Sequence, residues 1–296
     1  MIGVKVRFNI PDRCGKECRM LNYKTWPSFS LAVFLGGCAM LQPHHQAEQL
    51  AQSAGLQKSA INTGGFVLTA YSRLDDLDQP VNVYIEGDGL AWLSRYQLSA
   101  DPTPHEAIGL GLAVEDPAKN VVYLARPCQF NNFDLTPCDS AYWSNKRFSQ
   151  EVIEAMSFEL SAYMRKMHNR KINLIGYSGG AAVAALLAAR RNDVVSLRTV
   201  AGNLDHNFVN HYHEVDAMPE SLNAIDIAEK IKALPQLHFV GISDEVIPKQ
   251  VALRFIARQQ SQSSTAPCAG IIMVAAGHQE NWLQQWPELL RQPLPC

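Results

Sequence analysis

A serine flanked by glycines is the group in this chain whose position most clearly suggests chemistry. Residues 176–180 read Gly-Tyr-Ser-Gly-Gly, a match to the pattern Gly-x-Ser-x-Gly. An apolar run typical of a buried strand (172–175) precedes it, and an Ala- and Leu-rich run that favours helix (181–189) follows it. On a sharp strand-to-helix turn, the residues two before and two after the serine crowd each other, so only very small side chains fit. The pattern therefore predicts that Ser178 projects its hydroxyl as a nucleophile, and a plain glycine-rich turn is the alternative.

With its flanking strand and helix, this motif resembles the nucleophile turn of the α/β-hydrolase superfamily. The resemblance covers about residues 64–290 and implies an α/β fold, in which helices flank a mostly parallel central sheet. It also implies an acid and then a histidine after the serine in chain order. Asp244 and His278 fit that order, and each directly follows a predicted strand. Because parallel strands end at one edge of a sheet, Ser178, Asp244 and His278 are expected to meet there.

The resemblance gives each of these three residues a role. His278 would take the proton of Ser178, and Asp244 would hold the imidazole tautomer and stabilise its positive charge. Asp205, which also follows a predicted strand, is the alternative acid. A helix N-cap is the alternative role for Asp244, and a purely structural one is the alternative for His278.

The resemblance further implies an oxyanion hole formed by backbone amides. Gly179 would supply one amide, because it lies at the predicted N-terminus of the helix that follows the serine. The second is expected from residues 86–89, Glu-Gly-Asp-Gly, at the end of a predicted strand. Glu86 stands where many relatives have histidine, so the match is loose. The amide of Asp88 is the expected donor, and a simple turn is the alternative.

The remaining patterns predict the elements that must position these groups. Apolar or alternating runs predict strands at 65–71, 81–85, 120–125, 172–175, 194–200, 237–242 and 271–276. Helical spacing predicts helices at about 146–168, 181–189, 248–258 and 279–291. Residues 203–235 carry few strand signals and form a predicted lid-like insertion, which together with Trp92, Phe130 and Trp143 would shape a substrate pocket. The insertion contains His-x-His, but no carboxylate cluster accompanies it, so no metal site is expected.

The composition suits one large globular domain over residues 64–296. Hydrophobic residues make up 47% of the 296 residues, the formal net charge is −2, and no basic cluster is present. This balance gives no support to nucleic-acid binding.

Residues 1–37 have the layout of a secretory signal peptide. Lys24 precedes an apolar run (29–37) that is too short to span a bilayer as a helix. Met20 is an alternative start, which would leave Lys24 in a charged segment of normal length. A buried hydrophobic segment is the other interpretation.

Cys38 ends the sequence Leu-Gly-Gly-Cys, which resembles the bacterial lipobox. The resemblance implies cleavage before Cys38, diacylation of its thiol and acylation of its new amino group, with palmitate among the chains. Residues 38–63 would form a lipidated tether that runs into a first helical turn or two. Ala39 would fit sorting to the outer membrane of a Gram-negative envelope, facing the periplasm. An ordinary signal peptide is the alternative.

The cysteines agree with export. Four cysteines lie beyond the predicted leader and lipidation site: Cys128, Cys138, Cys268 and Cys296. An even number in an exported chain indicates disulfides. Three pairings are possible, and Cys128 with Cys138 and Cys268 with Cys296 is favoured because each bond closes a local segment. A zinc site is the alternative, but no Cys-x-x-Cys or suitably spaced histidine pair accompanies these residues.

The sequence therefore predicts a secreted, lipid-anchored serine hydrolase of esterase or lipase type, which cleaves a small or lipid-like carboxylic ester through an acyl-enzyme. No metal or organic cofactor is implied. Acyl transfer and thioester or amide cleavage are alternatives, because the same triad serves any acyl donor. A catalytically inactive hydrolase fold that binds a partner in the cell envelope is an alternative of a different class.

Overall fold

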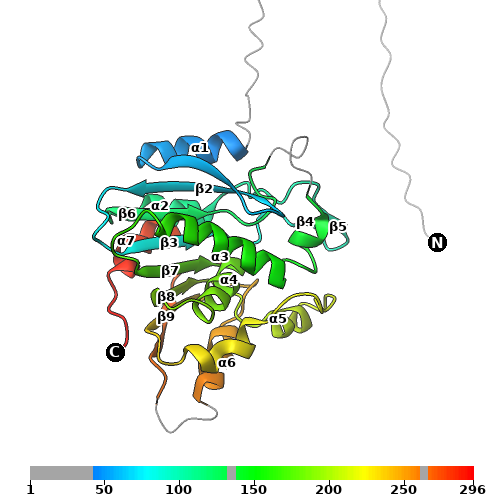
Figure 1. The fold of residues 1–296 in the computed structure, drawn as a ribbon. Coiled ribbons are helices and arrows are strands. Elements are labelled where there is room, and N and C mark those ends of the chain that lie inside the picture. Colours follow the sequence, from blue (N-terminus) through cyan, green and yellow to red (C-terminus); the bar gives the residue numbers. More distant parts are fainter. Residues whose placement is uncertain (1–42, 132–137, 261–265) are drawn as a thin grey trace, which may run out of the picture. The chain divides into compact units, whose positions relative to one another are not determined.

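An eight-stranded sheet lies at the centre of the computed structural model (Figure 1), which describes residues 43–131, 138–260 and 266–296. The strand order is β1-β2-β6-β3-β7-β8-β9-β10. Their bounds are β1 Gln57–Asn62, β2 Val67–Leu74, β3 Val81–Ile85, β6 Asn120–Leu124, β7 Ile172–Tyr177, β8 Val194–Val200, β9 Gln236–Gly241 and β10 Ala269–Val274. The β1–β2 and β2–β6 pairs are antiparallel, and all other pairs are parallel. The predicted mostly parallel sheet is therefore confirmed.

Helices cover both faces of this sheet and bury a separate hydrophobic core on each. One core contains side chains of α3 (Gln150–Met164), α4 (Gly179–Ala188) and α6 (Gln250–Gln260). The other contains side chains of α1 (Pro43–Ser53), α2 (Ile108–Val114) and α7 (Trp282–Leu290). The strands of the parallel part read as nearly continuous apolar runs because both of their faces are buried in this way. Within the described ranges, no helix is long and apolar enough to cross a bilayer.

The folded part begins earlier than the predicted start at residue 64. Residues 43–63, predicted as part of a tether, form α1 and the edge strand β1. Only Ala47 and Ala51 of α1 are buried, and β1 is polar and mostly exposed, so neither element carries a strong apolar pattern. The predicted signal peptide, Cys38 and the first residues of the tether lie outside the described residues.

Two further elements lie where the sequence pattern predicted a loop or nothing regular. A small hairpin, β4 (Trp92–Ser94) with β5 (Gln97–Leu98), interrupts the predicted loop after β3. The helix α2 has the sequence IGLGLAV, in which two glycines lower helix propensity, and it forms because six of its seven residues are buried against the sheet. The predicted insertion contains α5 (His206–Tyr212) and the 3₁₀ helix η2 (Ala224–Ile231) and no strand within residues 203–235.

The favoured disulfide pairing is confirmed. Cys128 bonds to Cys138 and Cys268 bonds to Cys296, with a Cα–Cα distance of 5.8 Å in each pair. The second bond joins the residue before β10 to the segment after α7. Both bonds restrict the unfolded chain, and each contributes roughly 2–4 kcal/mol to stability in an oxidising compartment.

Glu159 is a buried acid in α3 that has no partner. Its side chain has 0% relative exposure, and neither carboxyl oxygen has a hydrogen-bond partner in the described structure. Burial raises the pKa of Glu159 well above its ordinary value of 4.5. The folded protein therefore keeps a proton that the unfolded chain releases. The free energy of unfolding that depends on this proton is fully present below about pH 4.5. It is lost as the pH rises through the pKa of Glu159 in the folded state.

We therefore expect Glu159→Met to stabilise the protein, because it removes the buried acid at similar volume. The free energy of unfolding should rise by roughly 1–3 kcal/mol at pH 8 and by much less at pH 4, as measured by urea unfolding. Glu154→Met is the matched control, since Glu154 is an exposed residue of the same helix that bonds to Gln150. An equal change for Glu159→Met at both pH values would contradict the assignment of a neutral, buried carboxyl.

Candidate active site

Ser178 lies on a sharp turn between β7 and α4. Its backbone angles are φ 50° and ψ −120°, a combination that residues other than glycine rarely adopt. A Cβ at position 176 would lie 2.5 Å from the Cα of Ala181, and one at position 180 would lie 2.3 Å from the carbonyl oxygen of Ile85. The two flanking glycines are therefore required by the close approach of backbone atoms, as the sequence pattern predicted.

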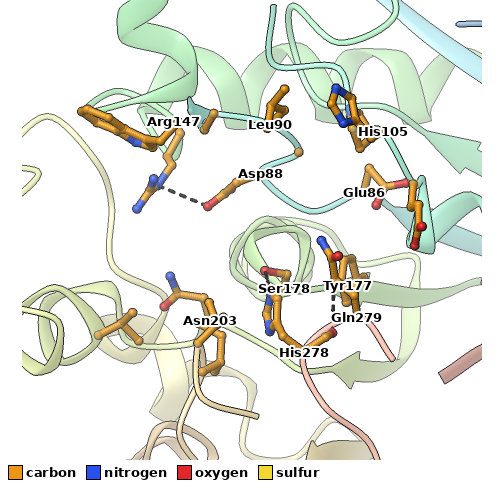
Figure 2. A pocket seen from close by; sticks show the side chains of 18 residues that line it. Glu86, Asp88, Leu90, His105, Arg147, Tyr177, Ser178, Asn203, His278 and Gln279 are labelled. Atoms are coloured by element: carbon orange, nitrogen blue, oxygen red, sulfur yellow. Dashed lines mark hydrogen bonds and ion pairs between the residues drawn. The ribbon is translucent and has the colours of Figure 1, made fainter. Parts of the chain in front are cut away.

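The structure brings Ser178, His278 and Asp244 together in hydrogen-bonding contact. The Oγ of Ser178 lies 3.0 Å from Nε2 of His278 (Figure 2), and Nδ1 of His278 lies 3.0 Å from Oδ2 of Asp244. The three residues follow β7, β10 and β9 respectively, and these strands end at the same edge of the sheet. The three side chains therefore lie together at this edge of the sheet, where they were expected.

Asp244 and His278 are each held by further contacts. Oδ1 of Asp244 accepts hydrogen bonds from the backbone N–H groups of Val246 (2.9 Å) and Ile247 (2.8 Å), and the side chain has no exposed surface. The carbonyl oxygen of His278 accepts hydrogen bonds from Tyr177 Oη and Trp282 Nε1, both at 3.0 Å. These contacts fix the carboxylate and the segment that carries the imidazole.

Asp205, the alternative acid, is engaged elsewhere. Its carboxylate accepts hydrogen bonds from the N–H of Phe208 (3.2 Å), Asn223 Nδ2 (2.9 Å) and Arg254 Nε (3.0 Å). The first of these contacts caps the N-terminus of α5. The contacts place Asp205 in the insertion as a structural residue, and they leave Asp244 as the acid that contacts His278.

Glu86 anchors the turn formed by residues 86–89. Its buried carboxylate accepts hydrogen bonds from the N–H groups of Gly87 and Gly109 through Oε1, and from the N–H of Leu110 and the Oη of Tyr123 through Oε2. Burial raises the pKa of Glu86, and these hydrogen bonds partly oppose that effect. The turn is thereby tied to the N-terminal part of α2 and to β6.

The turn places Asp88 directly against Gly179, so the two predicted oxyanion residues lie side by side. A Cβ at position 179 would lie 2.0 Å from Oδ1 of Asp88. The carboxylate of Asp88 also pairs with two arginines that the sequence analysis did not single out. Nη1 of Arg126 lies 3.2 Å from Oδ1. Nε of Arg147 lies 3.4 Å from Oδ2, and Figure 2 shows this second pair.

A cavity of about 590 Å³ opens over Ser178 and His278. The predicted insertion contributes Asn203 and Val209 to its wall, and Trp92 lines it as predicted. Phe130 and Trp143, predicted to shape the pocket, do not line it and are 4% and 5% exposed within the core. That part of the prediction is wrong, because both side chains pack inward from the loop after β6.

Neither the family models nor the curated proteins searched match this chain in sequence. Solved structures do match it in fold. An acylaminoacyl peptidase from Pyrococcus horikoshii aligns with 12% identity and a TM-score of 0.58 over 78% of this chain and 38% of its own. Est1E from Butyrivibrio proteoclasticus with bound ferulic acid aligns with 14% identity and a TM-score of 0.56, over 79% and 96% of the two chains.

A third structure, an esterase from Pyrococcus furiosus, aligns with 13% identity and a TM-score of 0.55 over 82% of this chain and 89% of its own. The alignments with this chain therefore cover 96% of Est1E and 89% of the Pyrococcus furiosus esterase, but only 38% of the peptidase. Together with the strand order, these similarities show that it has the α/β-hydrolase fold.

Proposed function

We propose that this protein is a serine hydrolase that cleaves carboxylic esters. The observation that carries the proposal is the contact of Ser178 Oγ with His278 Nε2 at 3.0 Å, backed by the contact of His278 Nδ1 with buried Asp244. A serine hydroxyl is a weak nucleophile until an adjacent base takes its proton, and this chain of contacts supplies that base. The cavity over Ser178 gives a substrate access to it.

The reaction proceeds in two acyl-transfer steps. In the first, the Oγ of Ser178 bonds to the ester carbonyl carbon, the proton passes to Nε2 of His278, and the carbon–oxygen bond to the alcohol breaks. His278 gives that proton to the departing alcohol. In the second step, water loses a proton to His278 and bonds to the acyl carbon, and the released Ser178 oxygen regains the proton as the carboxylic acid leaves.

The amides of Gly179 and Asp88 are the donors that we assign to the oxyanion of each tetrahedral intermediate. Gly179 begins α4, where the N–H groups are not used within the helix. The anchored turn at residues 86–89 holds Asp88 beside it. A preorganised amide of this kind lowers the barrier by roughly 3 kcal/mol.

Covalent labelling by a fluorophosphonate tests the proposal without knowledge of the natural substrate. We expect the purified protein to be labelled at Ser178 and to hydrolyse short p-nitrophenyl esters, a small-ester preference that is supported by the esterases among its structural neighbours. Absence of labelling would favour the inactive, partner-binding alternative. Labelling with transfer of the acyl group to an added alcohol or amine, or with faster cleavage of thioesters or amides, would favour the alternatives that use the same triad.

We further propose that the enzyme is exported and anchored by lipid at Cys38 on the periplasmic side of the outer membrane. The lipobox-like sequence and the two disulfides, which suit an oxidising compartment, support this location. The wild-type chain should partition with membranes and incorporate labelled palmitate when expressed in a Gram-negative host. Cys38→Ser should lose both properties, because the thiol is the acceptor of the diacylglyceryl group.

Cys14 and Cys18 lie in the predicted leader, so Cys14→Ser and Cys18→Ser are the matched controls and should retain both properties. Palmitate incorporation by the Cys38→Ser protein would contradict the assignment of the anchor. Two or more free thiols in the exported protein would contradict an oxidising compartment.

A further inference from the structure

Arg147 is a cation in the pocket wall that has no acceptor of its own. Its Nε lies 3.4 Å from Oδ2 of Asp88, but that carboxylate also pairs with Arg126 at 3.2 Å. In the described structure, the Nη groups of Arg147 donate no hydrogen bond. Two guanidinium groups thus share the carboxylate of Asp88, so that this carboxylate balances the charge of Arg147 only in part.

This charge is largely withdrawn from solvent. The side chain of Arg147 is 15% exposed, and that of Arg126 is 5% exposed. Burial lowers the pKa of Arg126 and of His206, and the charge of Arg147 lowers both further. A cation in such surroundings is costly unless an anion approaches it, because the pocket wall offers less solvation than water.

Asn203 presents a second polar group to the same space. The residue is 4% exposed, its Oδ1 is buried without a partner, and its carboxamide makes no hydrogen bond in the described structure. Both Asn203 and Arg147 line the cavity over Ser178, and Figure 2 shows their side chains directed into it from opposite walls. The Nη groups of Arg147 and the Nδ2 of Asn203 therefore face the cavity without donating a hydrogen bond in the described structure.

The position of Arg147 indicates which part of an ester would reach it. The departing alcohol must lie at Nε2 of His278, because it receives its proton there. Arg147 contacts Asp88, on the oxyanion side of Ser178, and it also lines a second cavity of about 420 Å³ that adjoins the first. The acyl part of the substrate is therefore the part that extends toward Arg147.

We propose that Arg147 and Asn203 form an anion-binding subsite and that the acyl part of the ester carries a terminal carboxylate. The substrate class is then the monoesters of dicarboxylic acids, in place of esters of simple fatty acids. The carboxylate pairs with the free face of the Arg147 guanidinium and accepts a hydrogen bond from Asn203 Nδ2. This inference rests on the proposed esterase function.

Pairs of esters that differ only in the terminal charge test the subsite. We compare the mono-p-nitrophenyl esters of adipic and pimelic acid with p-nitrophenyl hexanoate and heptanoate, which have the same chain lengths. The wild-type enzyme should have the higher kcat/KM for the charged member of each pair. Arg147→Gln should lower the charged-to-neutral ratio of kcat/KM roughly tenfold to a hundredfold, chiefly through KM, as expected for the loss of a charge-assisted hydrogen bond.

Three more variants separate charge recognition from general damage. Arg147→Lys should restore part of the ratio, because it keeps the charge but loses the planar fork. Asn203→Ala should lower the ratio by a smaller factor. Lys146→Gln is the matched control, since Lys146 pairs with Glu220 at 3.2 Å outside the cavity, and it should keep the wild-type ratio. A wild-type preference for the neutral esters, or an unchanged ratio in Arg147→Gln, would overturn the subsite.

Binding of adipate to Ser178→Ala, measured by calorimetry, distinguishes this inference from the proposed function. If adipate binds to Ser178→Ala and does not bind to the double variant with Arg147→Gln, the subsite is supported even if the wild-type protein cleaves no ester. Ester cleavage by the wild type without adipate binding to Ser178→Ala would overturn the subsite and leave the esterase function standing.

Discussion

Ser178→Ala is expected to abolish ester hydrolysis and fluorophosphonate labelling while the protein remains folded. The variant removes only the Oγ that contacts His278, and alanine has the same Cβ that the turn already accommodates. In enzymes with such a triad, loss of the serine lowers kcat by a factor on the order of 10⁶. Initial rates on a short p-nitrophenyl ester and the extent of labelling measure the effect.

Ser243→Ala is the matched control, because Ser243 is an exposed serine next to Asp244, and it should behave as wild type. Since Ser178 and His278 act as a unit, Ser178→Ala combined with His278→Ala should cost little more than either change alone. Full labelling of Ser178→Ala, or losses that add in the double variant, would remove the basis of the proposed mechanism.

Asp244→Asn is expected to lower kcat by a factor on the order of 10⁴, the loss known for the equivalent change in another triad. The asparagine oxygen can still accept the hydrogen bonds from Val246 and Ile247. The change instead removes the charge that stabilises the protonated imidazole, and it disturbs the tautomer at Nδ1 of His278.

Asp205→Asn is the comparison, because Asp205 also follows a strand but bonds to Arg254 and the N-terminus of α5. It should reduce the thermal stability and change kcat far less. If Asp205→Asn had the larger effect on kcat, the acid would have to be reassigned to the segment after β8.

The parallel strands and the meeting of the three candidate side chains could be predicted because each depends on local sequence. A strand buried on both faces leaves an apolar run, and a polar residue directly after it lies at the carboxyl edge of the sheet. Ser178, Asp244 and His278 all have this position. Chain order could not distinguish Asp244 from Asp205, because both lie between Ser178 and His278. The contacts do: Asp244 contacts His278, whereas Asp205 bonds to Phe208, Asn223 and Arg254.

The residues that were missed depend on contacts between distant segments. Arg126 and Asn203 also follow strands, β6 and β8, so the same rule of strand ends could have selected them. Nothing in the sequence indicates, however, that Arg126 and Arg147 converge on one carboxylate. The helix α2 was missed because its glycines oppose helix formation, and only burial against the sheet stabilises it.

The backbone angles of Ser178 imply a conflict between stability and activity at this one position. Holding a residue other than glycine at φ 50° and ψ −120° opposes folding by roughly 1–3 kcal/mol. Glycine would relieve that strain but would remove the hydroxyl, so Ser178→Gly should fold more stably than both the wild type and Ser178→Ala. Selection for thermal stability alone would therefore favour loss of the nucleophile, and a more stable active enzyme has to be sought at other positions.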